Sequence, residues 1–183
     1  MSKMNSVNIE ALPPLVERIE RSYYNVLNTL CDTARKQSRK LQELEVHQST
    51  SQYIILCNRL IEEIQQYLKV KKDSFLPYIN KLYEKEEEGH DCRNCEGLGS
   101  CNLQHDVQLN ELKESHAQIK DILYRLQMVV LPLYSETIYP DVYRVLRNNM
   151  ALIENCLTDL FSIEETILIP KVIEAQKNVH AYE

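Results

Sequence analysis

Residues 143–170, YRVLRNNMALIENCLTDLFSIEETILIP, decide the fold. Apolar side chains recur there at alternating steps of four and three residues, the pattern of one helix face packed lengthwise against other helices. These positions are Leu146, Met150, Ile153, Leu157, Leu160 and Ile167. Glu164 stands on the same face, one turn after Leu160. Burying a carboxylate is costly unless a cation or a metal faces it, so the central question is what lies opposite Glu164.

Composition narrows the class of protein. The chain has 183 residues, 44% of them hydrophobic, which is enough for one domain with a proper core. Only three glycines occur, all between residues 89 and 99, so we expect a nearly all-helical chain. A formal charge of −6 gives no reason to expect nucleic acid or an anionic membrane as a partner.

The chain shows no targeting or membrane signal. Its first residues are polar, and the longest apolar run, Met128–Leu133, is far too short to span a bilayer. We therefore expect a cytoplasmic protein in a reducing compartment, where the six cysteines are thiols or metal ligands rather than disulfides.

Three further segments carry apolar faces with the same spacing. Residues 1–10 are predicted to be disordered, and residues 11–183 to form a single antiparallel four-helix bundle of the all-α class. The predicted faces are Leu12, Val16, Ile19, Tyr23, Val26 and Leu30; then Cys57, Leu60, Ile64, Tyr67 and Lys71, with a kink or stop near Pro77; then Leu109, Leu112, His116, Ile119, Leu123, Leu126 and Val130, ending at Pro132.

The two halves of the chain repeat with a constant offset of 93 residues and no gap. Tyr23 then aligns with His116, Lys71 with Glu164, and Pro77 with Pro170. The bundle is therefore predicted to consist of two repeated helical hairpins related by a pseudo-twofold axis, with a Cys- and Gly-rich insertion at residues 89–105 between them.

The repeat also aligns the polar exceptions on the apolar faces. Tyr23, Tyr67, Lys71, His116 and Glu164 fall at matching heights, and bundle cores use such facing positions for cofactor and metal sites. A single Tyr or His on such a face is usually an ordinary core residue. Exceptions on all four helices favour a shared polar site in the core.

Two motifs resemble the hemerythrin-like proteins, and most closely the iron–sulfur cluster repair (repair of iron centres) family. Residues 114–121, ESHAQIKD, are similar to that family's Glu-His-x-x-x-Gly-Asp step. Residues 163–170, IEETILIP, are similar to its Leu-Glu-Asn-Asn-Ile-Leu-Phe-Pro step, and Asp73–Ile79 repeats the theme. The resemblance covers nearly the whole bundle and implies two irons held by histidines and carboxylates of the four helices.

Carried over position by position, the ligand set that the resemblance implies is broken. The positions that survive are His116, Glu164 and, less securely aligned, His47. The first helix has Tyr23 or Tyr24 in place of a histidine, the second has Tyr67 and Lys71 in place of a histidine and a glutamate, and the fourth has Leu160 in place of a histidine. A di-iron centre is therefore not expected.

Lys71 offers a physical explanation for the lost ligand positions. A protonated lysine cannot ligate a metal, but opposite Glu164 it can neutralise the carboxylate in the metal's place. We therefore predict a metal-free core with a Lys71–Glu164 ion pair. The competing prediction keeps one metal on His47, His116 and Glu164, with or without a Tyr phenolate, because three protein ligands can hold a metal with an open position.

The insertion is a second candidate site. Cys92 and Cys95 form a Cys-x-x-Cys step, and Cys101 with His90 or His105 would complete a Cys₃His set for one zinc or iron ion. The same thiols could form a redox switch through a Cys92–Cys95 disulfide. The third interpretation is a flexible loop with incidental thiols.

No catalytic triad, phosphate loop or acid–base carboxylate pair stands out, so the chain is more consistent with a non-enzymatic protein. One hypothesis is a hemerythrin-like bundle in iron handling or stress response, with its chemistry in the cysteine loop. The second is a metal-free structural or adaptor bundle that acts through a protein partner. The third is a residual iron-binding cluster-repair protein.

Overall fold

The computed structural model describes residues 10–44, 48–94, 105–133 and 140–179, and within these ranges it contains helices and no strand. Consecutive helical elements join end to end into long rods. Every rod except the third contains a short segment of different helical pitch. The elements are α1 Leu12–Ile19, η1 Glu20–Tyr24 and α2 Asn25–Gln42; α3 Gln48–Val70, η2 Lys71–Phe75 and α4 Leu76–Glu87; the short turn η3 Cys92–Asn94; α5 His105–Leu133; and α6 Asp141–Ile163, η4 Glu164–Leu168 and α7 Ile169–Asn178.

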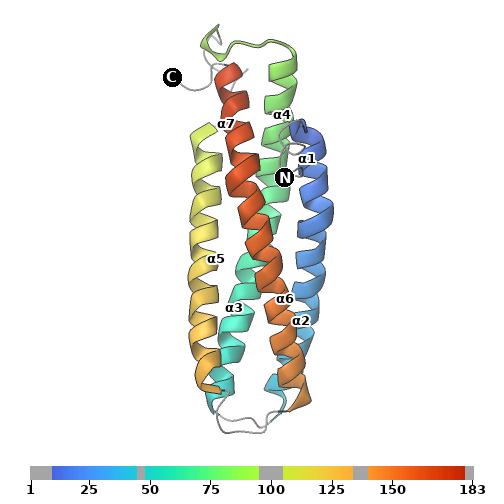
Figure 1. Ribbon diagram of the computed structural model, residues 1–183, viewed down its shortest axis with the longest axis vertical. Helices are drawn as coiled ribbons and strands as arrows, with labels where there is room; N and C mark the ends of the chain where they lie inside the picture. The colour runs from blue at the N-terminus through green and yellow to red at the C-terminus, as the bar shows by residue number, and fades with distance from the viewer. Residues whose placement is uncertain (1–9, 45–47, 95–104, 134–139, 180–183) are drawn as a thin grey trace, which may run out of the picture.

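The rods lie side by side as a helical bundle (Figure 1). Toward one end of the bundle, α2 packs against both α3 and α6, and α3 also packs against α5. Toward the other end, α4 packs against both α1 and α7. Residues 1–9 of the segment 1–10 that was predicted to be disordered, and the larger part of the 89–105 insertion, lie outside the described residues.

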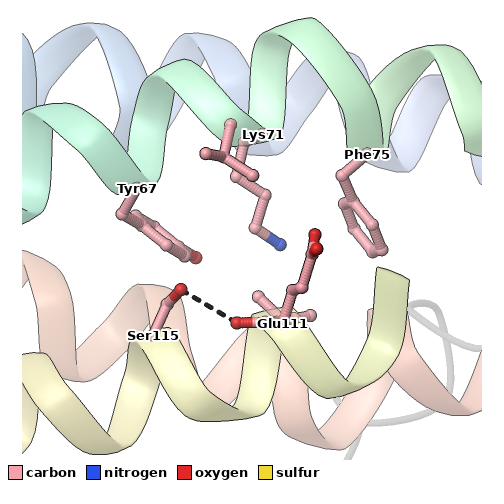
Figure 2. Close-up of a pocket in the computed structure, with 7 residues that line it drawn as sticks. Tyr67, Lys71, Phe75, Glu111 and Ser115 are labelled. Atoms are coloured by element: carbon pink, nitrogen blue, oxygen red, sulfur yellow. Dashed lines mark hydrogen bonds between the residues drawn. The ribbon is translucent and has the colours of Figure 1, made fainter. Parts of the chain in front are cut away.

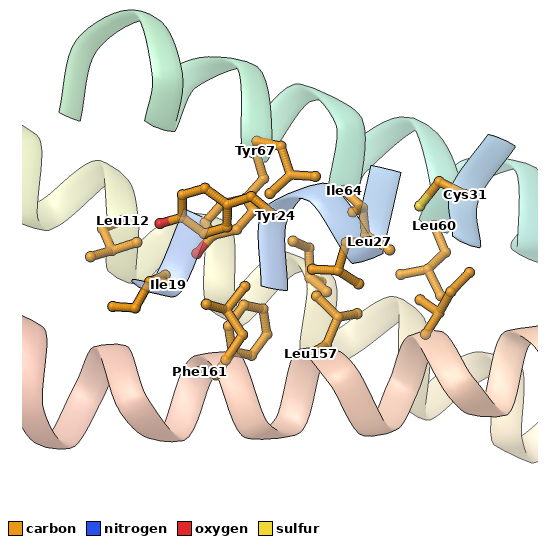
Figure 3. Close-up of a cluster of buried hydrophobic side chains, with 14 of the residues drawn as sticks. Ile19, Tyr24, Leu27, Cys31, Leu60, Ile64, Tyr67, Leu112, Leu157 and Phe161 are labelled. Carbon is orange, nitrogen blue, oxygen red and sulfur yellow. The ribbon is translucent and has the colours of Figure 1, made fainter. Parts of the chain in front are cut away.

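The core is a continuous set of apolar side chains from all of the rods. Figure 3 shows part of it, where Leu27, Ile64 and Leu157 are each fully buried. Removing such side chains from water is the main favourable term in folding a bundle, since the isolated helices are only marginally stable. The polar cluster around Glu164 lies within this apolar core.

Three π-helical turns interrupt the rods. In each, a backbone N–H bonds the carbonyl five residues earlier: Asn25 to Glu20, Leu76 to Lys71, and Ile169 to Glu164. A π turn places one extra residue in a helical turn, and such turns occur frequently at functional sites.

The extra residue shifts the buried face by one position, which corrects three sequence predictions. Tyr23 was placed on the predicted core face, with Tyr24 as its alternative; Tyr23 is only half-buried, and Tyr24 at the end of η1 is buried instead. Val26, also predicted inside, is 42% exposed, and Leu27 takes its place. After η4 the same shift buries Leu168 in place of the predicted Ile167, which is half-buried.

The internal repeat is visible but needs a gap. In the second rod of each half, the offset of 93 holds through the π turn, where Lys71 matches Glu164 and Phe75 matches Leu168, all four of them buried. In the first rod of each half the offset fails, because η1 has no counterpart in α5. The ungapped alignment of Tyr23 with His116 is therefore wrong, and Tyr24 is the residue that matches His116.

Pro77 does not end its helix, which excludes the stop that was predicted there as the alternative to a kink. It follows η2 at the first turn of α4, where its missing N–H is tolerated, and the helix continues to Glu87. Gly89 ends it: at φ +65° this residue adopts the left-handed conformation that glycine permits, and His90 N–H closes the end on Lys85 O at 3.0 Å. Within the described ranges, no helix has both the length and the apolar character to cross a membrane.

The π turn in the first rod leads to a deletion test. Removing the exposed Ser22 should convert η1 to a regular α-helical turn while Ile19 and Tyr24 both stay on the core face, because the turn holds one surplus residue. We expect this variant to fold with a cooperative thermal transition, followed by circular dichroism.

The matched control is deletion of the exposed Asn28, which lies in regular helix. It rotates the buried face of the rest of α2 by about 100° and should abolish the cooperative transition. Equal losses in the two variants would contradict the role assigned to η1.

Candidate functional site

The polar cluster is built at the height of the three π turns. Tyr24 is the last residue of η1, Lys71 is the first of η2 and Glu164 is the first of η4. His116 joins from the middle of α5 and Tyr67 from α3, one turn before Lys71. All five side chains are at least 95% buried.

Both carboxylate oxygens of Glu164 are engaged. The Tyr24 hydroxyl donates to Oε1 at 2.8 Å, and Lys71 Nζ lies 3.1 Å from the same oxygen. The Tyr67 hydroxyl donates to Oε2 through a short contact, and His116 Nε2 lies 2.7 Å from Oε2. Four side chains from the other three rods therefore converge on one buried carboxylate.

Lys71 is the cation opposite Glu164, at the position the sequence predicted. Its contact with Glu164 is an ion pair rather than a directed hydrogen bond, since no acceptor among the described residues meets the geometry that a Lys71 N–H needs. Its ammonium also lies 3.9 Å from the ring centroid of Phe75, a favourable cation–π contact. Lys71 thus has a partner for its charge, but its ammonium keeps N–H donors that no described residue accepts from.

His116 connects the buried carboxylate to the surface. Its Nδ1 lies 3.1 Å from Glu165 Oε1, and Lys120 Nζ donates to the same Glu165 oxygen at 2.7 Å. The Tyr67 hydroxyl also lies 3.3 Å from His116 Nε2, so the donor and acceptor roles of the two ring nitrogens depend on the imidazole tautomer. The ring also packs on Phe161, with centroids 4.0 Å apart.

Burial and nearby charge shift the pKa values of Glu164 and Lys71 in opposite directions, and those of the two tyrosines in the same direction. Burial alone would raise the pKa of Glu164, but Lys71, His116 and Tyr67 together lower it to about 2. Burial lowers the pKa of Lys71 to about 8, although the Glu164 charge opposes the shift. Burial and the nearby Glu164 carboxylate raise the pKa of Tyr24 and of Tyr67 well above the usual value for a phenol.

This donor set does not fit the di-iron centre that the resemblance implies. One carboxylate and one imidazole would serve as ligands, but the two tyrosines keep their protons and the fifth group is an ammonium. Glu164 has both oxygens occupied by protein donors. Within the described ranges no group of three or more His, Cys, Asp or Glu side chains is arranged to hold a metal ion.

His47, the other predicted core residue, lies outside the described residues. Gln48, which follows it, begins α3. At 1.5 Å per residue, Gln48 lies about 28 Å along the helix from Tyr67. The alternative of one metal on His47, His116 and Glu164 stays a prediction.

The predicted cysteine-loop site lies largely outside the described residues, which exclude Cys95, Cys101 and the side chain of His105. Cys92 and His90 are described and partly exposed. The Cys92 N–H donates to Val179 O at 2.9 Å, so the start of the loop is tied to the end of α7. The metal and redox interpretations of this loop stay predictions.

Two of the remaining cysteines are buried. Cys31 and Cys57 are fully enclosed, and burial raises the pKa of each to about 12. Thiols with such a high pKa are poor nucleophiles and pack as small hydrophobic groups.

Sequence reasoning missed Glu165 and Lys120, and it left Tyr23 and Tyr24 as alternatives. No apolar periodicity indicates Glu165, since it is exposed and acts only through His116. The signal for Tyr24 was available: two adjacent tyrosines follow Ile19, and a one-residue gap in the repeat would have selected the second.

Comparisons with protein-family models, with curated proteins and with solved structures give no match for this chain.

The ion pair can be tested by removing its cation. Lys71→Met should lower the free energy of unfolding by about 3–5 kcal/mol, because it leaves the Glu164 charge buried without its countercharge. In urea denaturation, the double variant Lys71→Met/Glu164→Gln should recover much of this loss. Lys72→Met, at the exposed next position, is the control and should change stability by no more than about 0.5 kcal/mol. A Lys71→Met loss as small as the control's would refute the pair.

The low pKa of Glu164 predicts a specific acid sensitivity. Because its pKa falls from 4.5 unfolded to about 2 folded, its contribution is fully present above about pH 4.5 and is lost as pH falls through 2. Urea unfolding between pH 6 and pH 2 should show a steeper loss for the wild type than for Glu164→Gln. Parallel curves for the two proteins would contradict the assigned shift.

Proposed function

We propose that the protein is a non-catalytic bundle of antiparallel, hemerythrin-like arrangement that works in iron handling or a stress response, with its chemistry in the 89–105 loop rather than in its core. One observation carries the proposal: Lys71 Nζ lies 3.1 Å from Glu164 Oε1, and both side chains are at most 3% exposed. An ammonium at that position repels a metal ion and neutralises the carboxylate that would otherwise bind one.

The rest of the core geometry supports a structural role. The phenols of Tyr24 and Tyr67 are hydrogen-bond donors to Glu164, which leaves no open coordination position on this carboxylate. A metal entering here would have to displace three protein donors and a buried cation. Such a pair need not add net stability.

We assign metal binding or thiol oxidation to the cysteines of the 89–105 loop. Cys92 is partly exposed, whereas burial raises the pKa of Cys31 and Cys57 to about 12. Cys-x-x-Cys thiols can hold zinc or iron with Cys101 and a histidine, or can form a reversible disulfide. Attachment of Cys92 to Val179 would couple either event to the end of α7.

A second candidate function is a metal-free adaptor that binds a protein partner. It is favoured by large apolar side chains on α3 and α5 that are exposed: Ile55 at 64%, Tyr124 at 61% and Met128 at 51%. Tyr124 and Met128 lie one turn apart on the same helix face. In this case neither metal nor a thiol pair would be needed.

Elemental analysis of protein purified anaerobically without a His tag separates these functions. We expect about one zinc or iron per chain in the wild type, and none in Cys92→Ser/Cys95→Ser, because Cys₃His sites bind one ion. A disulfide between Cys92 and Cys95 after mild oxidation, seen by peptide mass mapping, would instead support the redox form of the proposal.

The control is Cys31→Ser, which removes a buried thiol far from the loop in sequence. Metal that survives in the Cys92/Cys95 variant but disappears in Glu164→Gln would place the site in the core and overturn the proposal. Absence of both metal and disulfide would favour the adaptor.

A further inference from the structure

A small cavity lies beside the buried ion pair. It measures about 10 Å³ and is bounded by η2 and the end of α3 on one side and by α5 on the other. Its lining residues are Tyr67, Val70, Lys71, Phe75, Glu111, Leu112 and Ser115. A volume of this size holds about one water molecule.

Lys71 makes this cavity chemically distinctive. Its Nζ is buried and faces the space between the helices in Figure 2, and beyond its contact with Glu164 Oε1 at 3.1 Å at least two of its three N–H groups have no acceptor among the described residues. An ammonium has three N–H donors, and leaving them unmade inside a protein costs free energy. The position therefore calls for a hydrogen-bond acceptor within the cavity.

The opposite wall can bind the other side of such a molecule. Ser115 on α5 donates its hydrogen to the Glu111 backbone oxygen at 2.8 Å, so its own oxygen is still able to accept (Figure 2). In the same view the Glu111 carboxylate lies across the gap from the Lys71 nitrogen. A buried water needs two to four polar partners, and these groups supply them.

Charge and size exclude other occupants. The Glu111 and Glu164 carboxylates disfavour an anion, and the Lys71 ammonium disfavours a cation. An apolar guest would leave the ammonium donors unmade, and a larger molecule would not fit in about 10 Å³. What remains is a neutral molecule of one heavy atom that both donates and accepts.

We infer that this cavity is a binding site for one water molecule, held by Lys71 and Ser115, and that it is the route by which molecules of this size reach the buried polar cluster. The site depends on the Lys71–Glu164 geometry and is independent of the chemistry of the cysteine loop, so the two proposals can fail separately.

The test uses the full chain and two substitutions. In a high-resolution crystal structure we expect solvent density within hydrogen-bonding distance of Lys71 Nζ and Ser115 Oγ. Ser115→Leu should fill the cavity, remove this density and slow hydrogen exchange of the Lys71 ammonium, measured by NMR with ¹⁵N-lysine, on the order of tenfold or more, because exchange then requires local opening.

The matched control is Ser51→Leu, an exposed serine near the other end of α3, which should leave the Lys71 exchange rate unchanged. Ser115→Val gives the same comparison with a smaller side chain if the leucine variant does not fold. Absence of density beside Lys71 in the wild type, or equal exchange rates in the filled and control variants, would overturn the inference.

Discussion

The bundle depends on one buried charge. Glu164 is fully enclosed among apolar residues, where an ionised carboxylate is stable only if its neighbours replace the hydration it has lost. Lys71 supplies the countercharge, while Tyr24, Tyr67 and His116 supply hydrogen bonds to its two oxygens. These partners come from all of the other rods, so the carboxylate fixes their relative heights as well as its own ionisation.

The π turns make this convergence possible. Glu164 and Lys71 each begin a π turn and Tyr24 ends one, so the surplus residues are concentrated at the polar cluster. A π turn re-aims the side chains next to it without breaking the helix. The proline that follows two of these turns, Pro77 or Pro170, lies at the start of the next α-helix, where its missing N–H costs little.

Much of this could be read from the sequence, because helix faces follow a simple period. The four apolar faces and the repeat between hairpins come from spacing, and the pairing of Lys71 with Glu164 was predicted from that repeat together with the resemblance. The choice of Tyr24 over Tyr23, and of Leu168 over Ile167, could not be read in that way. Both choices depend on an extra residue in a helical turn. A pattern search that assumes one constant helical period cannot detect such an insertion.

Contacts made by exposed residues also could not be predicted from the sequence. Glu165 and Lys120 extend the cluster to the surface through His116, but an exposed acidic or basic residue on a helix carries no pattern that distinguishes it from a solvated one. The water-sized cavity beside Lys71 likewise depends on side-chain packing between α3 and α5 rather than on periodicity.

The central claim is that the Lys71 ammonium takes the place of a metal opposite Glu164. The most direct measurement is the free energy of unfolding of Lys71→Glu, with and without added Fe(II), in the Cys92→Ser/Cys95→Ser background so that loop thiols do not compete. The account predicts a large loss of stability without metal, because two carboxylates then face each other in the core, and partial recovery with Fe(II). A variant as stable as its Cys92→Ser/Cys95→Ser parent and indifferent to Fe(II) would contradict the account.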